Sequence, residues 1–141
     1  MKRDEKVLME FVVEGIAYWA FTHKPYEVAD QNYQVMLVPD AETVAKFEKL
    51  GHRVKDIKIN HDKTLRGVRI AKRREYGKPH IYDKNQDRIF MDEEIPNGTK
   101  VKVKFDEWEL DNKYGHFKGL RLMAIMLLED MPLPFDKVEN Y

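Results

Sequence analysis

The sequence contains no cysteine among its 141 residues. This absence excludes a disulfide framework, thiol catalysis and cysteine zinc sites, and it fits a reducing compartment. Long hydrophobic runs are missing too, since no stretch approaches the ~20 apolar residues of a membrane span. The first residues, MKRDEKVLMEF, carry charges but lack the apolar run of a signal peptide. We therefore expect a cytoplasmic protein.

Motifs of catalysis are also missing. The chain has no G-x-x-x-x-G-K-[ST] loop and no G-x-S-x-G elbow. Asp106, Glu109 and Asp111 would suit Mg²⁺ chemically, but strand alternation puts Asp106 and Glu109 on opposite faces. The histidines are scattered without metal-ligand spacing: His23, His52, His61, His80 and His116. We therefore predict no enzyme, no metal and no cofactor.

Charge is balanced in total but not along the chain. The sequence has 25 basic and 25 acidic residues, which taken alone argues against a nucleic-acid binder. Residues 53–88, however, carry 12 basic and 5 acidic residues, a net charge of +7. The flanking segments are acidic, with −3 over residues 1–52 and −4 over residues 89–141. For judging whether the chain binds nucleic acid, this uneven distribution of charge is more informative than the total charge.

The length predicts one domain, which we place at residues 1–130, followed by a short tail at 131–141. KVKVKF at 100–105 alternates strictly, so it predicts a half-buried strand with lysines on the exposed face. Residues 111–115 indicate a hairpin turn. The next strand is predicted at 117–128. Alternation should place Leu120, Leu122, Ala124, Met126 and Leu128 on one face and Arg121, Met123, Ile125 and Leu127 on the other. Further strands are predicted at 11–21 (with a kink at Gly15), 33–38, 65–71, 81–83 and 88–90.

One short helix is well signalled. Asp40 is suited to cap it, Val44 and Phe47 recur at helical spacing, and Gly51 is suited to end it. Several short strands with one helix predict a mainly β protein. The leading candidate is an OB fold, a five-stranded, partly open barrel with one short α-helix.

Basic and aromatic residues are interleaved in the central segment. Cations neutralise phosphates and aromatic rings stack on unpaired bases, so this mixture is typical of single-stranded nucleic-acid binding and needs no fixed spacing. A solvated charged loop has the same composition, and the sequence leaves both interpretations open. The candidates are Arg66, Arg69, Lys72, Arg73, Arg74, Tyr76, Lys78, His80 and Tyr82.

Two other groups of aromatic and basic residues are candidates. In the first strand we expect Trp19 and Phe21 inside and Tyr18 outside, with Lys24 just beyond. The last hairpin of an OB fold grips oligonucleotides. Trp108 in this hairpin has two interpretations. It is either an exposed ring on which a base stacks or a hydrophobic side chain that covers the end of the barrel. The candidates in and near this hairpin are Lys102, Lys104, Trp108, Tyr114 and Lys118.

The tail combines acidic side chains with a terminal aromatic. Pro132 and Pro134 oppose helix or central-strand structure. Fraying of a chain end is the simpler interpretation. A contact with a partner protein is the alternative, and its candidate residues are Phe135, Asp136, Glu139 and Tyr141.

The order of these segments resembles the single-stranded DNA-binding proteins of T7-like and related phages. The similarity spans most of the chain, although the tail is shorter and less acidic and the family's hairpin aromatics are not matched residue by residue. Trp108 and Tyr114 are the nearest candidates for them. The similar segments are YWAF at 18–21, KPY at 24–26, NYQVMLVP at 32–39, KVKVKF at 100–105 and the closing strand at 120–129.

The resemblance implies an OB fold and sequence-independent binding of single-stranded DNA during replication, recombination and repair. It also implies a homodimer, and a tail that contacts polymerase and helicase and competes with DNA. Two alternatives stay open: an OB-fold accessory factor that binds RNA or protein, and a nuclease using Asp106, Glu109 or Asp111.

Overall fold

Alternating apolar and polar side chains build the centre of the sheet. Strand β1 (Glu5–Phe21) pairs antiparallel with β7 (Thr99–Asn112), and β7 pairs antiparallel with β8 (Gly115–Leu127). In β7 the side chains of Val101, Val103 and Phe105 are fully buried, whereas Lys104 between them is exposed. The predicted strand at 100–105 and the hairpin turn after it are therefore confirmed.

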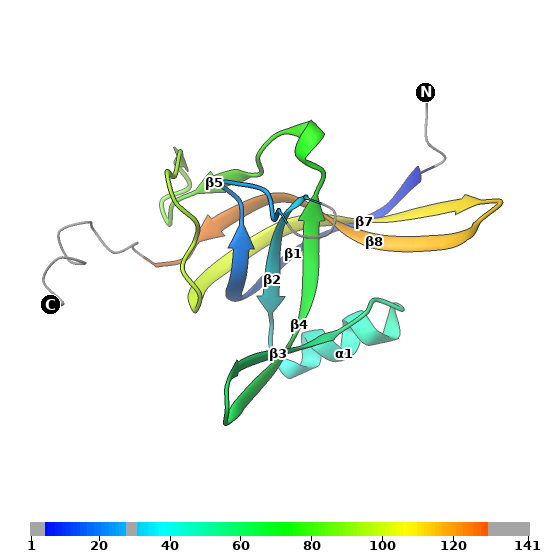
Figure 1. Ribbon diagram of the computed structural model, residues 1–141, viewed down its shortest axis with the longest axis horizontal. Helices are drawn as coiled ribbons and strands as arrows, with labels where there is room; N and C mark the ends of the chain where they lie inside the picture. Colours follow the sequence, from blue (N-terminus) through cyan, green and yellow to red (C-terminus); the bar gives the residue numbers. More distant parts are fainter. Residues whose placement is uncertain (1–4, 28–30, 130–141) are drawn as a thin grey trace, which may run out of the picture.

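The computed structural model describes residues 5–27 and 31–129, which form one curved sheet with a helix on one side (Figure 1). The strand order is β3-β4-β2-β1-β7-β8-β5-β6. The sheet curls until β4 meets β8, where Ala71 lies opposite Arg121 in a parallel pairing. The other elements are β2 (Tyr33–Val38), α1 (Ala41–Lys49), β3 (Lys55–Asn60), β4 (Lys63–Lys72), η1 (Arg74–Tyr76), β5 (His80–Tyr82) and β6 (Arg88–Ile89).

The helix begins and ends at the predicted residues. The Asp40 carboxylate accepts a hydrogen bond from the backbone N–H of Thr43 at 2.8 Å, which satisfies one of the free donors of the first turn. Val44 and Phe47 are buried, and Phe47 packs against Phe105 with ring centroids 5.9 Å apart. Gly51 follows at a φ of +88°, a conformation that glycine adopts without strain.

The predicted alternation in β8 is wrong beyond Leu122. Phe105 pairs with Leu122 but its neighbour Lys104 pairs with Ala124, so Met123 is an extra residue in a β-bulge. A bulge reverses which residues face inward. Leu120 and Leu122 are buried before it, and Ile125 and Leu127 are buried after it. Ala124 and Met126, expected on the face of Leu122, therefore lie on the opposite, outer face.

The predicted orientation of the aromatic residues in β1 is also wrong. Trp19 is 41% exposed, and Phe21 is only half-buried and stacks on Tyr26, with ring centroids 4.6 Å apart. The pairing of β1 with β2 shifts between Tyr18 and Phe21, and Trp19 has a φ of +46°. This bulge leaves Ala17 and Ala20 to face the core.

Gly15, where a kink was expected, has another role. A Cβ at this position would lie 2.7 Å from the carbonyl oxygen of Val38, so only glycine allows β1 and β2 to come this close. The core gathers side chains from β1, β2, α1, β4, β7 and β8. The fold is mainly β and OB-like, as predicted, although the described chain has eight strands rather than five. No helix within the described residues is long and apolar enough to cross a membrane.

Candidate nucleic-acid interface

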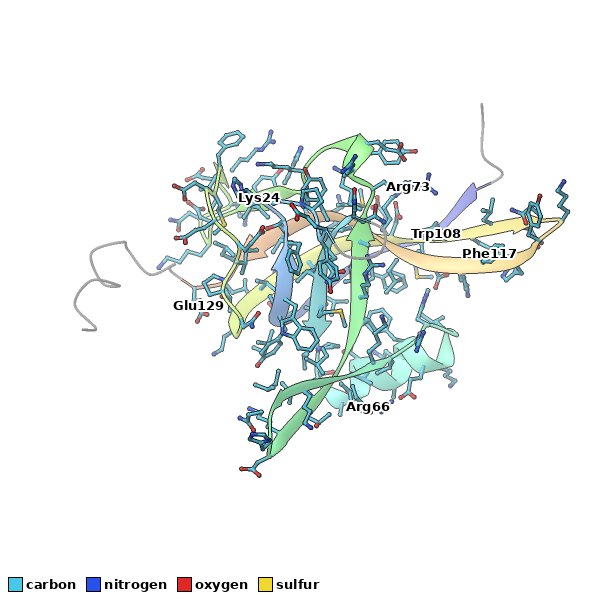
Figure 2. The ribbon with its side chains drawn as sticks, in the orientation of Figure 1. Lys24, Arg66, Arg73, Trp108, Phe117 and Glu129 are labelled. Atoms are coloured by element: carbon cyan, nitrogen blue, oxygen red, sulfur yellow. The ribbon has the colours of Figure 1, made fainter. Side chains whose placement is uncertain are left out.

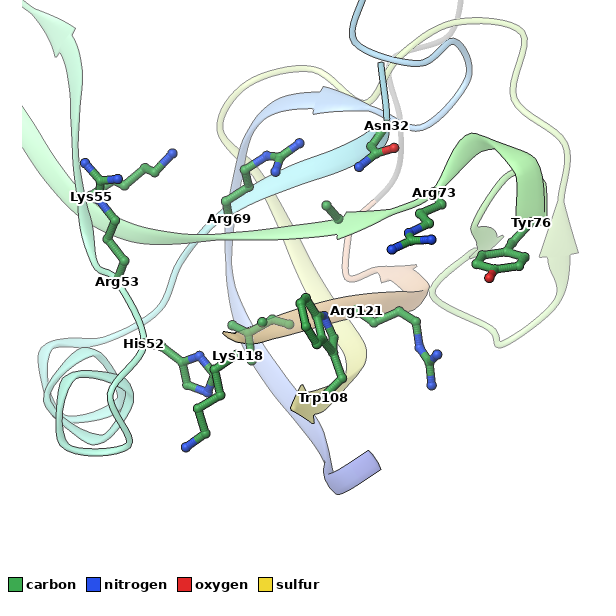
Figure 3. A pocket seen from close by; sticks show the side chains of 13 residues that line it. Asn32, His52, Arg53, Lys55, Arg69, Arg73, Tyr76, Trp108, Lys118 and Arg121 are labelled. Carbon is green, nitrogen blue, oxygen red and sulfur yellow. The ribbon is translucent and has the colours of Figure 1, made fainter. Parts of the chain in front are cut away.

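A hollow of about 430 Å³ lies where β4 meets the β7–β8 hairpin (Figure 3). We call it the basic hollow, and none of the described residues that line it is acidic. Its cations come from the start of β3 and the residues before it, from β4 and the residue after it, and from β8. Its aromatic rings come from η1 and β7. The lining residues are Asn32, His52, Arg53, Lys55, Arg69, Ala71, Arg73, Tyr76, Trp108, Lys118, Gly119, Leu120 and Arg121.

Strand alternation in β4 turns Arg69 toward the basic hollow. Val68 and Ile70 are buried in the core, so Arg69 and Ala71 face outward. The guanidinium Nε of Arg69 donates a 2.7 Å hydrogen bond to the Gln34 side-chain oxygen on the neighbouring strand β2. This bond ties the arginine side chain to β2.

The indole of Trp108 lies against the backbone of β8. Trp108 and Gly119 are opposite each other in the β7–β8 ladder. A Cβ at Gly119 would lie 2.5 Å from Trp108 Cζ2, closer than real side chains approach. The glycine therefore lets the ring lie flat on the strand, where it lines the basic hollow instead of plugging the core. A flat aromatic surface beside cations is suited to stack on an unpaired base.

Two carboxylates behind the basic hollow orient its cations. Asp106 is 3% exposed and accepts hydrogen bonds from Arg121 at 2.6 and 3.2 Å, and its second oxygen has no partner among the described residues. Glu107 is buried in a pair with His52, and its other oxygen lies 3.8 Å from Lys118 Nζ. Both carboxylates are buried, Asp106 in the wall of a second hollow along β8, so Arg121 and Lys118 supply most of the accessible charge.

The basic hollow brings together five of the predicted residues: Arg69, Arg73, Tyr76, Trp108 and Lys118. It also contains residues that the sequence analysis missed, notably Arg53, Lys55 and Arg121. Arg53 and Lys55 belong to the basic segment 53–88 but were not chosen, because no aromatic residue accompanies them. Arg121 lies outside that segment and meets the others only where β4 pairs with β8. Their contribution to binding stays a prediction, as it does for the five.

Four of the predicted residues lie outside the basic hollow but close to it. Lys72, Tyr82 and Lys104 line a second hollow along β8, and Lys102 joins Tyr82 and Lys104 in a third. Partial burial and the charge of Arg121 lower the pKa of Lys72. Each of these residues stays a candidate.

The remaining predicted residues are dispersed. Arg66 pairs with Glu48 of the helix at 3.1 Å, and Arg74 donates to the Gln31 side chain at 2.8 Å. Figure 2 places Arg66 near the helix, whereas Arg73 lies beyond the opposite end of β4. Lys78 contacts His23 at 3.2 Å. The others are Tyr18, half-buried opposite Met36, Lys24, exposed after β1, and Tyr114, 77% exposed at the hairpin tip.

The acidic residues weighed as a metal site have other partners. Asp106 pairs with Arg121, while Glu109 lies 2.7 Å and Asp111 3.5 Å from His116. Among the described residues, no three histidines or carboxylates gather as metal ligands would. The candidate tail residues Phe135, Asp136, Glu139 and Tyr141 lie outside the described residues.

No sequence-family profile and no curated protein sequence matches the chain. Three-dimensional comparison does find similar structures. The single-stranded DNA-binding protein from bacteriophage Enc34, solved in complex with ssDNA, is 16% identical with a TM-score of 0.63, over 87% of this chain and 88% of that one. The gp2.5 single-stranded DNA-binding protein of bacteriophage T7 is also 16% identical, with a TM-score of 0.53 over 94% of each chain. The chain therefore has the fold of phage single-stranded DNA-binding proteins.

Proposed function

We propose that the protein binds single-stranded DNA without sequence preference, as a phage-type protein of replication, recombination and repair. The observation that carries this proposal is the basic hollow, which combines six cations and two aromatic rings with no acidic lining residue among those described. It lies on a fold shared with phage proteins that bind single-stranded DNA.

The chemistry of the basic hollow favours a single strand over a duplex. Arginine and lysine contact phosphates whatever the base, and every base has a face that can stack on Trp108 or Tyr76. In a duplex the base faces are stacked on one another, so an aromatic ring cannot reach them. Asn32 is the one uncharged side chain among the described lining residues that carries an amide for reading base edges. Sequence-independent binding follows.

Two adjacent arginines provide a sharp test. Arg73 lines the basic hollow, whereas Arg74 is directed to Gln31. On a single strand, log K falls with log salt by about 0.7 per phosphate contact. Arg73→Ala should therefore flatten the salt slope by about 0.7, while Arg74→Ala, the same change in charge, should leave it unchanged. Equal slopes for the two variants would assign Arg73 to solvated surface.

The same titration separates the alternatives. Single strands of unrelated sequence should bind with similar affinity, and duplex DNA more weakly. A preference for RNA of the same sequence would mean that the site recognises the 2′-hydroxyl, as an RNA accessory factor does. Strand cleavage on addition of Mg²⁺ would instead indicate a nuclease.

We further propose that residues 131–141 contact a replication polymerase or helicase in the host cytoplasm, that their carboxylates compete with DNA, and that the protein forms a homodimer. Asp136, Glu139 and the aromatic Tyr141 of this segment support the first two points. Deleting it should weaken capture of the partner and tighten DNA binding modestly at low salt, since salt screens such competition. A truncated protein that dissociates from a dimer without losing the partner would contradict this role.

A further inference from the structure

The outer face of the sheet carries a second surface beside the basic hollow. Because of the β8 bulge, four residues form a straight row across β1, β7, β8 and β5: Val12, Lys104, Ala124 and His80. In the next row, Lys102 lies opposite Met126, which lies opposite Tyr82. We call these seven residues the outer shelf. Its centre is apolar, and its lysines project from the adjacent strand.

The outer shelf is continuous with the basic hollow. Tyr76 and Arg121 line both the basic hollow and the second hollow along β8. Tyr82, Lys104 and Ala124 line both the second hollow and the third, which lies on the outer shelf itself. On β7 the outward side chains follow one another as Trp108, Asp106, Lys104 and Lys102. Six residues of strand span about 20 Å, which is long enough for several nucleotides.

The electrostatics of this surface favour a polyanion. Two carboxylates are present, and each is paired with a cation. Glu14 lies opposite Lys102 in the β1–β7 ladder, 3.7 Å from its Nζ, and Asp106, buried in the wall of the second hollow, is paired with Arg121. Desolvation, and then the positive charges of Arg88 and Lys72, lower the pKa of His80. Lys72, Lys104 and Arg121 line the second hollow together with the one carboxylate of Asp106, so a phosphate there would meet mainly positive charge.

The apolar centre narrows the choice of polyanion. Val12 is 60% exposed, and Ala124, Met126 and Tyr82 are half-buried. An apolar floor beside lysines suits a chain that offers both base faces and phosphates, which a single strand does and a duplex does not. The outer shelf is continuous with the basic hollow, and its lysines complement the charge of phosphates. Both observations favour a DNA single strand as the molecule that occupies the outer shelf.

We propose that a DNA strand leaving the basic hollow passes Tyr76 and Arg121 and continues across the outer shelf, with phosphates on Lys102 and Lys104 and a base against Tyr82. This proposal rests on the proposed function and adds to it. The binding site then has two segments in series. Only a strand long enough to fill both should contact the outer shelf.

Oligonucleotide length provides the test, using the full chain and oligothymidylates of about 5 and 16 nucleotides, near the ends of the range for one OB fold. The double variant Lys102→Ala/Lys104→Ala should bind the short strand with unchanged affinity. For the long strand, the double substitution should reduce the slope of log K against log salt by about 1.4, which corresponds to two phosphate contacts. Tyr82→Ala should weaken only the long strand, on the order of tenfold.

Two further variants keep the result interpretable. Lys58→Ala/Lys63→Ala removes the same charge from the β3–β4 hairpin, remote from the outer shelf, and should change neither strand. Lys102→Gln/Lys104→Gln retains side-chain length in case the alanine pair unfolds, and it should reproduce the loss on the long strand.

The possible failures are distinguishable. If Arg73→Ala weakens the short strand but the shelf variants bind the long strand normally, the strand does not cross the outer shelf and this inference is overturned alone. If the short strand is unaffected by Arg73→Ala, the proposed function itself fails. Shelf variants that dissociate a dimer while binding the long strand normally would assign the outer shelf to contact between copies of the chain, and would also overturn it.

Discussion

At the scale of single residues, Gly119 decides how Trp108 is presented. Tryptophan in a strand usually packs its ring against neighbouring side chains, but Gly119 has none, so the indole rests on the backbone. The ring keeps one face for the basic hollow because its other face is held by β8. Glycine at this position thus shapes the basic hollow rather than a turn.

A single methyl group tests this role. Gly119→Ala would place a Cβ 2.5 Å from the indole, so the ring must move out of its position. We expect the variant to stay folded, since the clash is with a side chain at the surface, and to weaken single-stranded DNA binding. The loss should approach that of Trp108→Ala, about 1–3 kcal/mol for one stacked base.

Fluorescence provides the matching measurement. The sequence has 2 tryptophans, so a Trp19→Phe background reports on Trp108 alone. In that background DNA should quench the emission, and Gly119→Ala should reduce the quench. Full quenching and unchanged affinity in the alanine variant would mean that the position of the ring is irrelevant to binding.

The residues of the candidate site were only partly predictable. Arg69, Arg73 and Tyr76 were identified because they cluster in a segment of unusual composition. Arg121 was not, because its place in the basic hollow depends on two distant strands meeting, where Ala71 pairs with Arg121. The basic residues can be read from the sequence, but the curvature of the sheet decides which of them lie on the same surface.

At the scale of elements, regular patterns were predicted well and irregular ones poorly. The strand at Tyr33–Val38 and the capped helix match their predicted bounds closely. Strand β3 was missed because KDIKIN is mostly polar, with Ile57 its one fully buried side chain. The bulges at Trp19 and Met123 were missed because an extra residue is defined by the partner strand, which the local pattern does not contain.

The helix cap gives a pH-dependent prediction. Hydrogen bonds from the Thr43 side chain and then its backbone N–H hold the pKa of Asp40 below the ordinary value of 3.8. A carboxyl whose pKa is lowered by folding stabilises the protein above its unfolded pKa, and this contribution is lost as pH falls through the folded value. Asp40→Ala should therefore lower the melting temperature at neutral pH, with a difference from wild type that closes below about pH 4.

Asn at the same position is the control for this prediction. Asparagine caps helices about as well as aspartate but does not titrate. Asp40→Asn should therefore retain most of the melting temperature at neutral pH and show less change on acidification. A difference between wild type and Asp40→Ala that persists at low pH would show that the ionised carboxylate is not what stabilises the helix.

At the scale of the whole molecule, neutrality in total charge coexists with a basic surface. The 25 acidic residues balance the 25 basic ones, yet none of the described residues lining the basic hollow is acidic. Exposed charges farther apart than about 8 Å are largely screened at physiological salt, so a strand bound as we propose would respond to the local surface charge rather than to the total charge. Net charge alone therefore does not argue against the proposed ligand.

Binding to this surface should stabilise the whole fold. The basic hollow draws on η1, β7, β8 and the segments around β3 and β4, so it exists only in the folded chain. A ligand that binds only the folded state adds about 2.7 kcal/mol of stability when its free concentration is 100 times Kd. Single-stranded DNA should therefore raise the melting temperature, and the rise should shrink as salt weakens binding.

Two controls locate the stabilising contacts. Duplex DNA at equal nucleotide concentration should raise the melting temperature less than single-stranded DNA does. With single-stranded DNA, the Arg73→Ala variant should show a smaller rise than the Arg74→Ala variant. Equal rises for the two variants, or for the two forms of DNA, would place the stabilising contacts outside the basic hollow.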